Sequence, residues 1–247
     1  MKAVILGATK GMGRAVARVL VERGDSVFLL GRGSEELQAS ASDLEQRAKQ
    51  TQSVGFYAEC DLEQPEGFGA AFEAAERGLP GFDCVIVTAG VFATQAALEA
   101  DLTFARRVLS VNYVSTVLFC EEARRRLLAR GGGTLAVWSS VAGERGRKPI
   151  VIYGSAKAGL SAYLEGLDHK YHAEGLRVVC VKPGFVKTAA SDGLPVPPFA
   201  GEPEAVAQDA VRAIDAGTPV LYTPRIWALI MLVIRLLPRF VMRRIGF

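Results

Sequence analysis

The sequence predicts one α/β domain with a parallel sheet, and three observations carry this prediction. Short runs of Val, Ile and Leu alternate along the chain with longer segments that have helical periodicity. The short runs are apolar at nearly every central position, as in strands that helices cover on both faces. No linker or internal repeat divides residues 1–224, and 247 residues are an ordinary length for one domain of this class.

Seven strands and six helices follow from this pattern. The expected strands, each of four to six residues, are Lys2–Leu6, Ser26–Leu30, Val54–Tyr57, Asp83–Thr88, Thr134–Trp138, Arg177–Lys182 and Pro219–Tyr222. The expected helices lie near residues 11–23, 34–50, 66–77, 101–130, 151–174 and 203–215. Because strands and helices alternate, we expect right-handed crossovers and a doubly wound, seven-stranded sheet with helices on both faces.

Two segments lie outside this alternation. Residues 184–202 hold three prolines and three glycines, and they form a connection that is long for an α/β protein, as lids over binding sites often are. Residues 225–247 form an apolar, basic tail with five arginines and no acid. We therefore divide the chain into a catalytic and cofactor-binding domain, residues 1–224, and an amphipathic tail, residues 225–247.

Composition excludes several classes of protein. Half of the residues are hydrophobic and the net charge is only +3, which excludes a disordered chain. The four cysteines stand singly in apolar contexts, and no spacing typical of a zinc or iron–sulfur site occurs, so we expect reduced thiols and no metal. His169 and His172 have no third ligand nearby in sequence. The start of the chain has no signal-peptide core, which indicates a cytoplasmic protein, and nucleic acid is not an expected partner.

A glycine-rich turn follows the first expected strand. It comprises Gly7, Ala8, Thr9, Lys10, Gly11, Met12 and Gly13, and a helix follows directly. Glycines allow the backbone to turn sharply and to approach a pyrophosphate, which the N–H groups at the start of the helix would bind. A purely structural turn is the alternative, but the position at the start of a βαβ unit favours a dinucleotide and a Rossmann-type fold.

The residues after the second strand indicate which dinucleotide binds. A site for NAD(H) usually has an acid here to accept hydrogen bonds from the ribose, whereas this chain has Arg32 and no acid before Glu35. Arg32 and Lys10 are expected to face the adenosine ribose, where a 2′-phosphate would lie. We therefore expect NADP(H) to be preferred over NAD(H). The alternative is that both cations are solvated surface residues.

A reactive group is expected after the fifth strand. Ser140 ends that strand, and Tyr153 and Lys157 lie four residues apart on the next helix, so both project from one face. A lysine ammonium beside a phenol would lower the pKa of Tyr153 toward the range useful for acid–base catalysis. Ser140 could donate a hydrogen bond to a carbonyl oxygen and hold it in place.

The chain resembles the short-chain dehydrogenase/reductase family over essentially its whole length. The motifs that carry the resemblance are GATKGMG, Cys60-Asp61-Leu62, Thr88-Ala89-Gly90, Asn112, Ser140, Tyr153, Lys157 and the segment Pro183-Gly184-Phe185-Val186-Lys187-Thr188. The chain departs from the family pattern in two places: Leu6 replaces the usual Thr before the first glycine, and Val87-Thr88 replaces an Asn pair. Both departures affect residues that brace loops, so the hydrogen bonding there is open.

The resemblance implies roles for these residues. Asp61 and Leu62 would flank the adenine, and Ala89 and Gly90 would line the cofactor channel. Pro183, Gly184, Val186 and Thr188 would hold the nicotinamide and its phosphate, with Tyr153 and Lys157 also in contact with the cofactor. Asn112 would anchor a water that relays protons to Lys157. The family also forms dimers or tetramers that pair the long helices, here 101–130 and 151–174.

The expected activity is NADPH-dependent reduction of a ketone to an alcohol, with Tyr153 as proton donor. An alcohol dehydrogenase working in the oxidative direction and a non-catalytic NADP(H)-binding regulatory protein are the alternatives. A narrower likeness concerns SSVAGERGR, YGSAKAGL and the C-terminal tail, which are similar to mycobacterial decaprenylphosphoryl-2-keto-ribose reductases. This likeness implies a lipid-linked keto sugar as substrate. We expect Arg145, Arg147 and Lys148 at the rim of the pocket, where they would suit a phosphate-bearing substrate; the alternative is that they are solvent-exposed surface cations.

The tail has two compatible interpretations. Its apolar run from Ile226 to Leu237 would form a helix about 18 Å long, too short to cross about 30 Å of hydrocarbon. It could close the substrate pocket or pack in an oligomer interface. It could also lie on the inner face of a membrane, with Trp227 and Phe240 in the interface and the arginines near lipid head groups.

Overall fold

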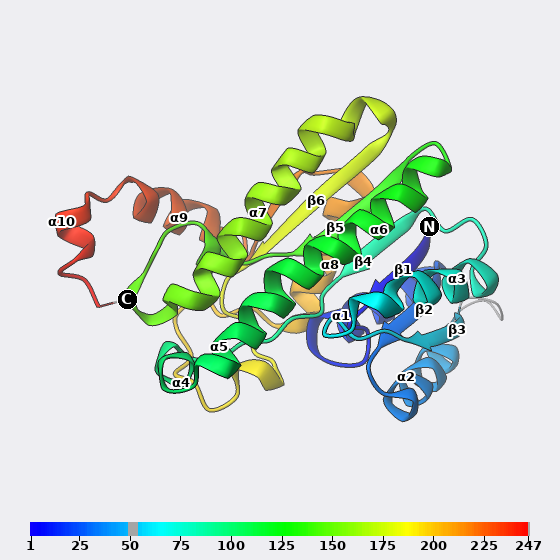
Figure 1. Ribbon diagram of the computed structural model, residues 1–247, viewed down its shortest axis with the longest axis horizontal. Helices are drawn as coiled ribbons and strands as arrows, with labels where there is room; N and C mark the ends of the chain where they lie inside the picture. The colour runs from blue at the N-terminus through cyan, green and yellow to red at the C-terminus, as the bar shows by residue number, and fades with distance from the viewer. Residues whose placement is uncertain (49–53, 247) are drawn as a thin grey trace.

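A computed structural model describes residues 1–48 and 54–246 and contains a seven-stranded parallel sheet with the order β3-β2-β1-β4-β5-β6-β7 (Figure 1). The strands are β1 (Lys2–Leu6), β2 (Ser26–Gly31), β3 (Val54–Glu59), β4 (Cys84–Val87), β5 (Gly133–Trp138), β6 (Leu176–Pro183) and β7 (Val220–Thr223). Each neighbouring pair is parallel. The doubly wound sheet predicted from the sequence is confirmed, with strand ends that shift by one or two residues.

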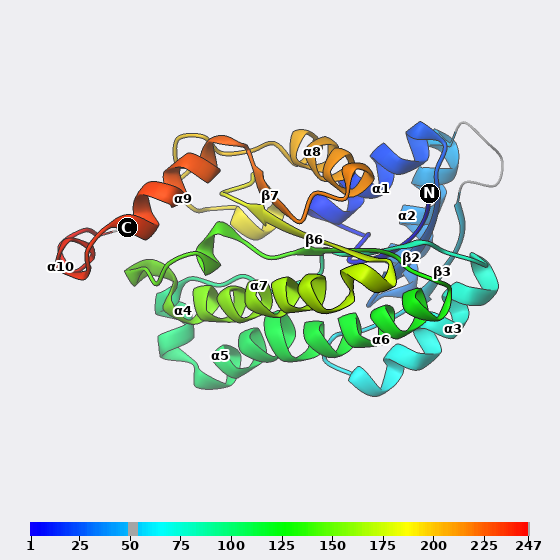
Figure 2. The ribbon, with the colours of Figure 1, turned by 90° about the horizontal axis from the view of Figure 1, so that it is seen from above.

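Helices cover both faces of the sheet (Figure 2). On one face lie α1 (Gly11–Arg23), α2 (Ser34–Arg47) and α8 (Pro203–Ala216), and on the other lie α3 (Phe68–Gly78), α4 (Gln95–Ala100), α5 (Leu102–Leu109), α6 (Thr116–Ala129) and α7 (Val151–Tyr171). Burial on both faces explains why the strand sequences are apolar without alternation. In β1, for example, Val4 and Leu6 belong to one core cluster, and Ala3 and Ile5 belong to the other.

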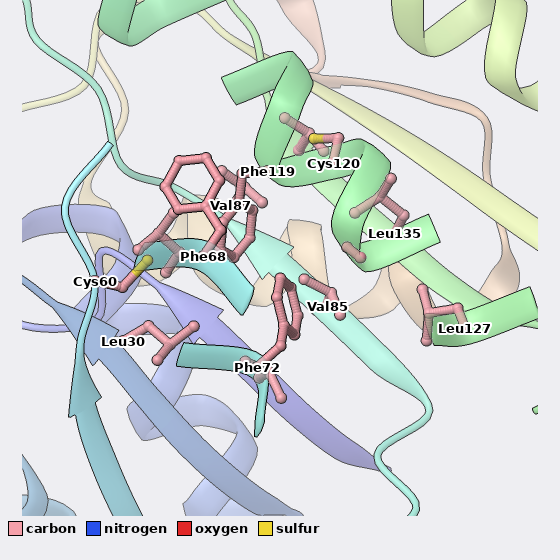
Figure 3. Close-up of a cluster of buried hydrophobic side chains, with 14 of the residues drawn as sticks. Leu30, Cys60, Phe68, Phe72, Val85, Val87, Phe119, Cys120, Leu127 and Leu135 are labelled. Carbon is pink, nitrogen blue, oxygen red and sulfur yellow. The ribbon is translucent and has the colours of Figure 1, made fainter. Parts of the chain in front are cut away.

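Aromatic packing fills the core between the sheet and α3 and α6 (Figure 3). The ring of Phe68 meets that of Phe119 edge-on at 5.3 Å between centroids, and Phe72 lies 4.9 Å from the same ring. Such pairs contribute about 1 kcal/mol each beyond the burial of their apolar area. This cluster packs α6, together with the helical turn that precedes it, against β4 and β5 of the sheet.

The helix expected over 101–130 contains a π-helical turn at Ser110–Ser115, between α5 and α6. Two side chains stabilise this wider turn: Asn112 Nδ2 donates to the Val108 carbonyl at 2.9 Å, and Thr116 Oγ1 donates to the Val111 carbonyl at 2.7 Å. Periodicity alone does not reveal an extra residue in a helix of this kind. Single π-turns of this type frequently lie at functional sites.

The other expected helices follow the sequence pattern closely, whereas α4 was not expected. The helix expected over 34–50 ends at Arg47, and its last two predicted residues lie outside the part of the chain that the structure describes. The helix expected over 151–174 ends at Tyr171, and a short 3₁₀ turn, His172–Glu174, completes it.

The strand order reverses beside β1, between β1 and β4. From β1 the chain proceeds outward to β2 and β3 and then returns to β4 on the other side of β1. In open α/β sheets, ligands bind in the crevice outside the strand ends at such a reversal. The glycine turn after β1 and the segments after β4, β5 and β6 all lie at the carboxyl edge of the sheet.

The tail folds into α9 (Ile226–Leu236) and α10 (Arg239–Met242), which project from one end of the molecule (Figure 1, Figure 2). One side of α9 is nevertheless packed: Met231 and Ile234 are buried against Val141, the residue after Ser140. Throughout the described residues, the helices are too short or too polar to cross a membrane.

Candidate active site

The glycine turn after β1 is packed against the segment that follows β4. Gly7 has φ +94°, in the left-handed region that favours glycine, and a Cβ there would lie 2.7 Å from the Ala89 nitrogen. A Cβ on Gly13 would collide with the Gly7 carbonyl oxygen and with Thr88 Oγ1. Only glycine fits at both positions, so the turn has the tight backbone geometry that the sequence predicted.

Thr88 braces this turn. Its Oγ1 donates to the Leu6 carbonyl at 3.0 Å and lies 3.3 Å from the Gly7 carbonyl oxygen. Thr88, one of the departures of the chain from the family pattern, therefore hydrogen-bonds the main chain at the end of β1.

The turn leaves the start of α1 available to an anion. The helix begins at Gly11, and within the described residues no side chain caps this end; the first N–H to bond within the helix is that of Arg14, to the Lys10 carbonyl. A Cβ built on Gly11 would lie 3.8 Å from Thr188 Cγ2, so the segment after β6 faces this N-terminus. Backbone N–H groups at a helix start, close to a glycine cradle, fit a pyrophosphate.

Lys10 immediately precedes α1 and Arg32 immediately follows β2, so both lie at the carboxyl edge of the sheet, but both have acidic partners. Lys10 Nζ is 2.6 Å from Glu36, and Arg32 Nη1 is 3.8 Å from Glu63, which Arg107 holds more closely at 2.6 Å. Glu59, opposite Gly31 in the sheet, also accepts from the Ser34 nitrogen at 3.0 Å. Although the sequence has no acid between β2 and Glu35, acids from α2, β3 and the turn after β3 approach these cations and the start of α2 in space.

These ion pairs are weak. The Arg32 side chain is 63% exposed and the Lys10 side chain 71%. Exposed pairs of this kind contribute only about 0–1 kcal/mol, because water and salt screen them. Both cations therefore remain available to a phosphate that arrives at the crevice.

The residues expected around the adenine and the cofactor channel lie beside the same crevice. Leu62 is buried, and Asp61 Oδ1 accepts from the Glu63 nitrogen at 3.0 Å, which fixes the turn after β3. Ala89 touches the glycine turn. A Cβ on Gly90 would lie 2.7 Å from Asn112 Oδ1 and 3.8 Å from Lys157 Nζ, so Gly90 joins the cofactor crevice to the reactive residues.

Ser140, Tyr153 and Lys157 come together where β5 meets α7. Ser140 Oγ accepts from the Ala142 nitrogen at 3.1 Å, which orients the hydroxyl at the end of β5. Lys157 Nζ donates to the Trp138 carbonyl at 2.8 Å and lies 5.9 Å from the centroid of the Tyr153 ring. Phe92, after β4, packs edge-on against that ring at 5.1 Å and holds it from the other side.

Burial shifts both titratable groups. It raises the pKa of Tyr153 to about 12, although the Ser140 hydroxyl has a smaller opposite effect. It lowers the pKa of Lys157 to about 8. The expectation that Lys157 lowers the pKa of Tyr153 is therefore wrong for this structure: the ammonium points to a main-chain carbonyl, and desolvation of the phenolate is the larger effect.

Asn112 lies in the π-helical turn and is almost fully buried. Its Oδ1 accepts from the Val91 nitrogen at 3.2 Å, and its Nδ2 donates to the Val91 carbonyl at 2.6 Å as well as to that of Val108. The carboxamide thus fixes the segment after β4 against the helix. This contact places Asn112 beside Gly90 and Lys157, where the resemblance expects it.

The segment from Pro183 to Thr188 forms the remaining wall. Gly184 N donates to the Thr223 carbonyl at 3.0 Å, and Val186 pairs with Gly201 in an isolated parallel bridge. The Thr188 side chain caps a short 3₁₀ helix, Ala189–Ser191. The long connection over 184–202 is thus anchored at both ends next to the crevice, which suits a cover over a ligand.

Sequence reasoning missed two residues of the site. Phe92 lies two residues after Gly90 of the Ala89-Gly90 motif, so its proximity could have been inferred. Glu144 could not, because its partners Lys182 and Arg235 are far away in sequence.

The fold and the site define a class: a Rossmann-type protein with a dinucleotide turn beside a Ser–Tyr–Lys group is a nicotinamide-dependent oxidoreductase. The family model described as short chain dehydrogenase matches residues 1–195, and the chain belongs to this family.

Named relatives agree with that assignment. The chain is 34% identical to an uncharacterized oxidoreductase of Mycobacterium tuberculosis over 98% of this chain and 95% of that one. It is 30% identical to carbonyl reductase family member 4 of Danio rerio, over 87% and 91% of the two chains. The solved structure of a short-chain dehydrogenase/reductase from Mycobacterium ulcerans superposes with a TM-score of 0.81 at 22% identity, covering 90% of this chain and 87% of that one, and so shares the fold.

Replacing Lys157 by Met should stabilise the protein near pH 7. The drop in the pKa of Lys157 from 10.5 to about 8 corresponds to a cost of about 3 kcal/mol for burying the charged amine. Loss of the bond to the Trp138 carbonyl offsets about 1 kcal/mol of the gain. The folded state binds fewer protons than the unfolded state between pH 8 and 10.5, so wild-type stability rises through that window and the advantage of the variant shrinks.

Urea unfolding at pH 7 and at pH 10 measures this difference. Lys170→Met, an exposed change on the same helix, is the control and should have little effect. A Lys157→Met protein that is less stable than wild type at pH 7 would contradict the assignment of an uncompensated buried charge.

Proposed function

We propose that this protein catalyses the NADPH-dependent reduction of a ketone to an alcohol. The observation that carries the proposal is that Lys157 lies beside the Tyr153 ring and Gly90, at the edge of the sheet where Ser140 follows β5. Burial raises the pKa of Tyr153, so the phenol is protonated at neutral pH and can give a proton to a carbonyl oxygen.

The side chains have distinct roles in this proposal. When bound, the nicotinamide supplies hydride to the carbonyl carbon. Ser140 donates a hydrogen bond that holds and polarises the carbonyl oxygen, and Tyr153 transfers its proton to that oxygen. Lys157 is buried beside the Tyr153 ring and Gly90, and in this proposal it contacts the nicotinamide ribose and returns a proton to Tyr153. Asn112 fixes the segment after β4, whose Gly90 lies beside Lys157.

Two other functions remain as outcomes of the test. An alcohol dehydrogenase would need Tyr153 as a base, so its rate should increase with pH far above neutrality. A regulatory protein that only binds NADP(H) would show no turnover, although it would retain the glycine turn and the crevice. The convergence of Ser140, Tyr153 and Lys157 favours an enzyme over the regulatory protein.

Tyr153→Phe should abolish turnover while leaving the affinity for NADPH near that of wild type. The variant removes only the hydroxyl, and the ring still packs against Phe92. Initial rates of NADPH consumption, combined with a fluorescence titration of cofactor binding, separate the two effects. Residual activity above about one tenth would exclude Tyr153 as the main proton donor, since general acid catalysis typically contributes about 100-fold or more.

We also propose that the site prefers NADP(H). Arg32 and Lys10 lie at the adenosine end of the crevice, and each is held only by an exposed ion pair. The acids nearby moderate this preference, because Glu63 and Glu36 must release the two cations to a 2′-phosphate. A guanidinium matches phosphate geometry better than an ammonium does, so Arg32 should contribute more than Lys10.

Arg32→Asp should therefore reverse or remove the preference. Wild type should bind NADPH at least about tenfold more tightly than NADH, which corresponds to about 1.4 kcal/mol. The variant should lose affinity for NADPH and keep its affinity for NADH. Calorimetric titration with both cofactors measures this, with the exposed Arg77→Asp on α3 as the control. Equal affinities in wild type would show that the cations do not reach the cofactor.

A phosphate-bearing or lipid-linked ketone is the proposed substrate class. In the segment between Ser140 and Tyr153, Arg145 donates to the Leu237 carbonyl and Lys148 to the Arg243 carbonyl, so both are occupied by the tail. Arg147 takes part in none of the ion pairs found among the described residues, and its Nε is buried without a partner. Burial lowers the pKa of Arg147, which indicates a charge that an anionic ligand would stabilise.

We further propose that the tail contacts an anionic membrane surface, and that the body of the protein forms dimers or tetramers through the long helices. Exposed apolar side chains follow one side of α9 and continue onto α10: Ile226, Leu229, Val233, Leu236 and Phe240. Four of the five tail arginines have no ion pair among the described residues; Arg235 alone is paired, with Glu144. Such a surface fits lipid head groups over a shallow apolar layer.

Replacing Leu229 and Val233 together by Gln should abolish binding to vesicles. Wild type should sediment with phosphatidylglycerol vesicles, less with phosphatidylcholine vesicles, and should be released as salt increases. Phe56→Gln is the matched control, because Phe56 is as exposed as Leu229, at 58%, but lies on β3 at the opposite end. If wild type ignores vesicles and the double variant instead changes the sedimentation coefficient, this face binds a second copy of the chain.

A further inference from the structure

Glu144 is a buried acid for which the proposed reaction has no use. Its side chain is only 6% exposed. Its Oε1 lies 2.6 Å from Lys182 Nζ, and its Oε2 lies 3.3 Å from Arg235 Nη1. One carboxylate therefore neutralises two cations, of which Lys182 is 12% exposed and Arg235 54%.

The three residues belong to three different segments of the site. Glu144 follows the 3₁₀ turn Val141–Gly143, directly after Ser140. Lys182 immediately precedes Pro183 and Gly184, at the end of β6. Arg235 lies in the last turn of α9. We call residues 140–144 the serine segment and residues 183–188 the nicotinamide wall. The Glu144 carboxylate thus joins the serine segment to the nicotinamide wall and to α9.

The serine segment is also packed tightly on the side that faces α7, away from Lys182. A Cβ on Gly143 would lie 2.6 Å from the Lys157 carbonyl carbon, so the 3₁₀ turn is pressed against the main chain of α7. With α7 on one side and Lys182 on the other, the position of Ser140 relative to the nicotinamide wall depends on the length of the Glu144 link.

The C-terminal helix closes the arrangement from outside. A Cβ on Gly184 would collide with the Trp227 indole, and Trp227 Nε1 donates to the Phe199 carbonyl at 3.2 Å. Met231 and Ile234 pack on Val141. Contacts of α9 therefore reach both the serine segment and the nicotinamide wall, at the same two places that Glu144 connects.

We propose that Glu144 is a positioning residue that sets the distance between Ser140 and the nicotinamide wall and makes α9 part of the active site. Although burial alone lowers the pKa of Lys182, the hydrogen bond with Glu144 raises it above its usual value, so the Lys182 amine is charged at neutral pH. Removing the carboxylate leaves a buried ammonium without a counter-charge, which favours movement of the segment. Misplacement by about 1 Å can reduce a rate about 100-fold.

Glu144→Gln in the full chain tests this inference, which rests on the proposed ketone reduction. We expect kcat on a small neutral ketone to fall at least about tenfold, with a larger isotope effect from deuterated NADPH. The Kd for NADPH should stay within about threefold of wild type, because the glycine turn is unaffected. A residue needed only for folding would reduce the amount of native protein without this split between kcat and cofactor affinity.

Glu122→Gln is the matched control. Glu122 is also a partly buried glutamate that pairs with two cations, Arg125 and Arg126, but it lies on α6 away from the site. Its kcat should remain within twofold of wild type. Glu144→Gln with Lys182→Gln should be no slower than Glu144→Gln alone, because the double variant leaves no unpaired ammonium.

Hydrogen exchange supplies a measurement that does not depend on turnover. Amides of residues 141–148 should exchange faster in Glu144→Gln than in wild type or Glu122→Gln, in the protein without cofactor. The inference is overturned if Glu144→Gln has a kcat within twofold of wild type and unchanged hydrogen exchange.

If Glu144→Gln does not fold, Arg235→Met removes the exposed partner of the same carboxylate. This variant should lower kcat about threefold, and a wild-type kcat in Arg235→Met would refute the role of α9. Failure of the proposed function is distinct, since Tyr153→Phe would then retain turnover.

Discussion

The close contact between the glycine turn after β1 and the segment after β4 is the constraint on which the site depends. Gly7 and Gly13 have no room for a Cβ, and Thr88 Oγ1 bonds the main chain at the end of β1. This contact sets the start of α1 at the point where the strand order reverses. The same segment after β4 leads to Gly90, which touches Asn112 and approaches Lys157. The cofactor crevice and the reactive residues are thereby positioned by one continuous set of backbone contacts.

Much of this arrangement could be predicted because its determinants are local in the sequence. Apolar runs and helical periodicity predict the strands and helices, since covered parallel strands and amphipathic helices bury their side chains in characteristic patterns. The spacing of Tyr153 and Lys157 places both on one face of α7, and Ser140 ends a strand whose carboxyl end must reach the same edge. The assignment of the fold therefore needed no information about contacts between distant residues.

What the sequence could not predict depends on contacts between distant residues. The π-turn at Asn112 requires side-chain bonds to particular main-chain carbonyls, which periodicity does not reveal. Glu63 reaches Arg32 only because the turn after β3 lies beside the end of β2. The direction of the pKa shift of Tyr153 depends on how strongly burial desolvates the phenol and on whether the Lys157 ammonium points toward it. The spacing of the two residues in the sequence determines neither.

Burial separates the cations around the site into two groups with different consequences. Lys182 is compensated by Glu144, so it contributes to the rigidity of the wall. Lys157 is almost fully buried and bonds only a main-chain carbonyl in the described structure, and the lowered pKa reflects the cost. A cation that lacks a counter-charge destabilises the fold, and a ligand with oxygen acceptors lowers that cost when it binds. In the proposed reaction, Lys157 would therefore be stabilised by bound cofactor, whereas Lys182, paired with Glu144, would keep its position.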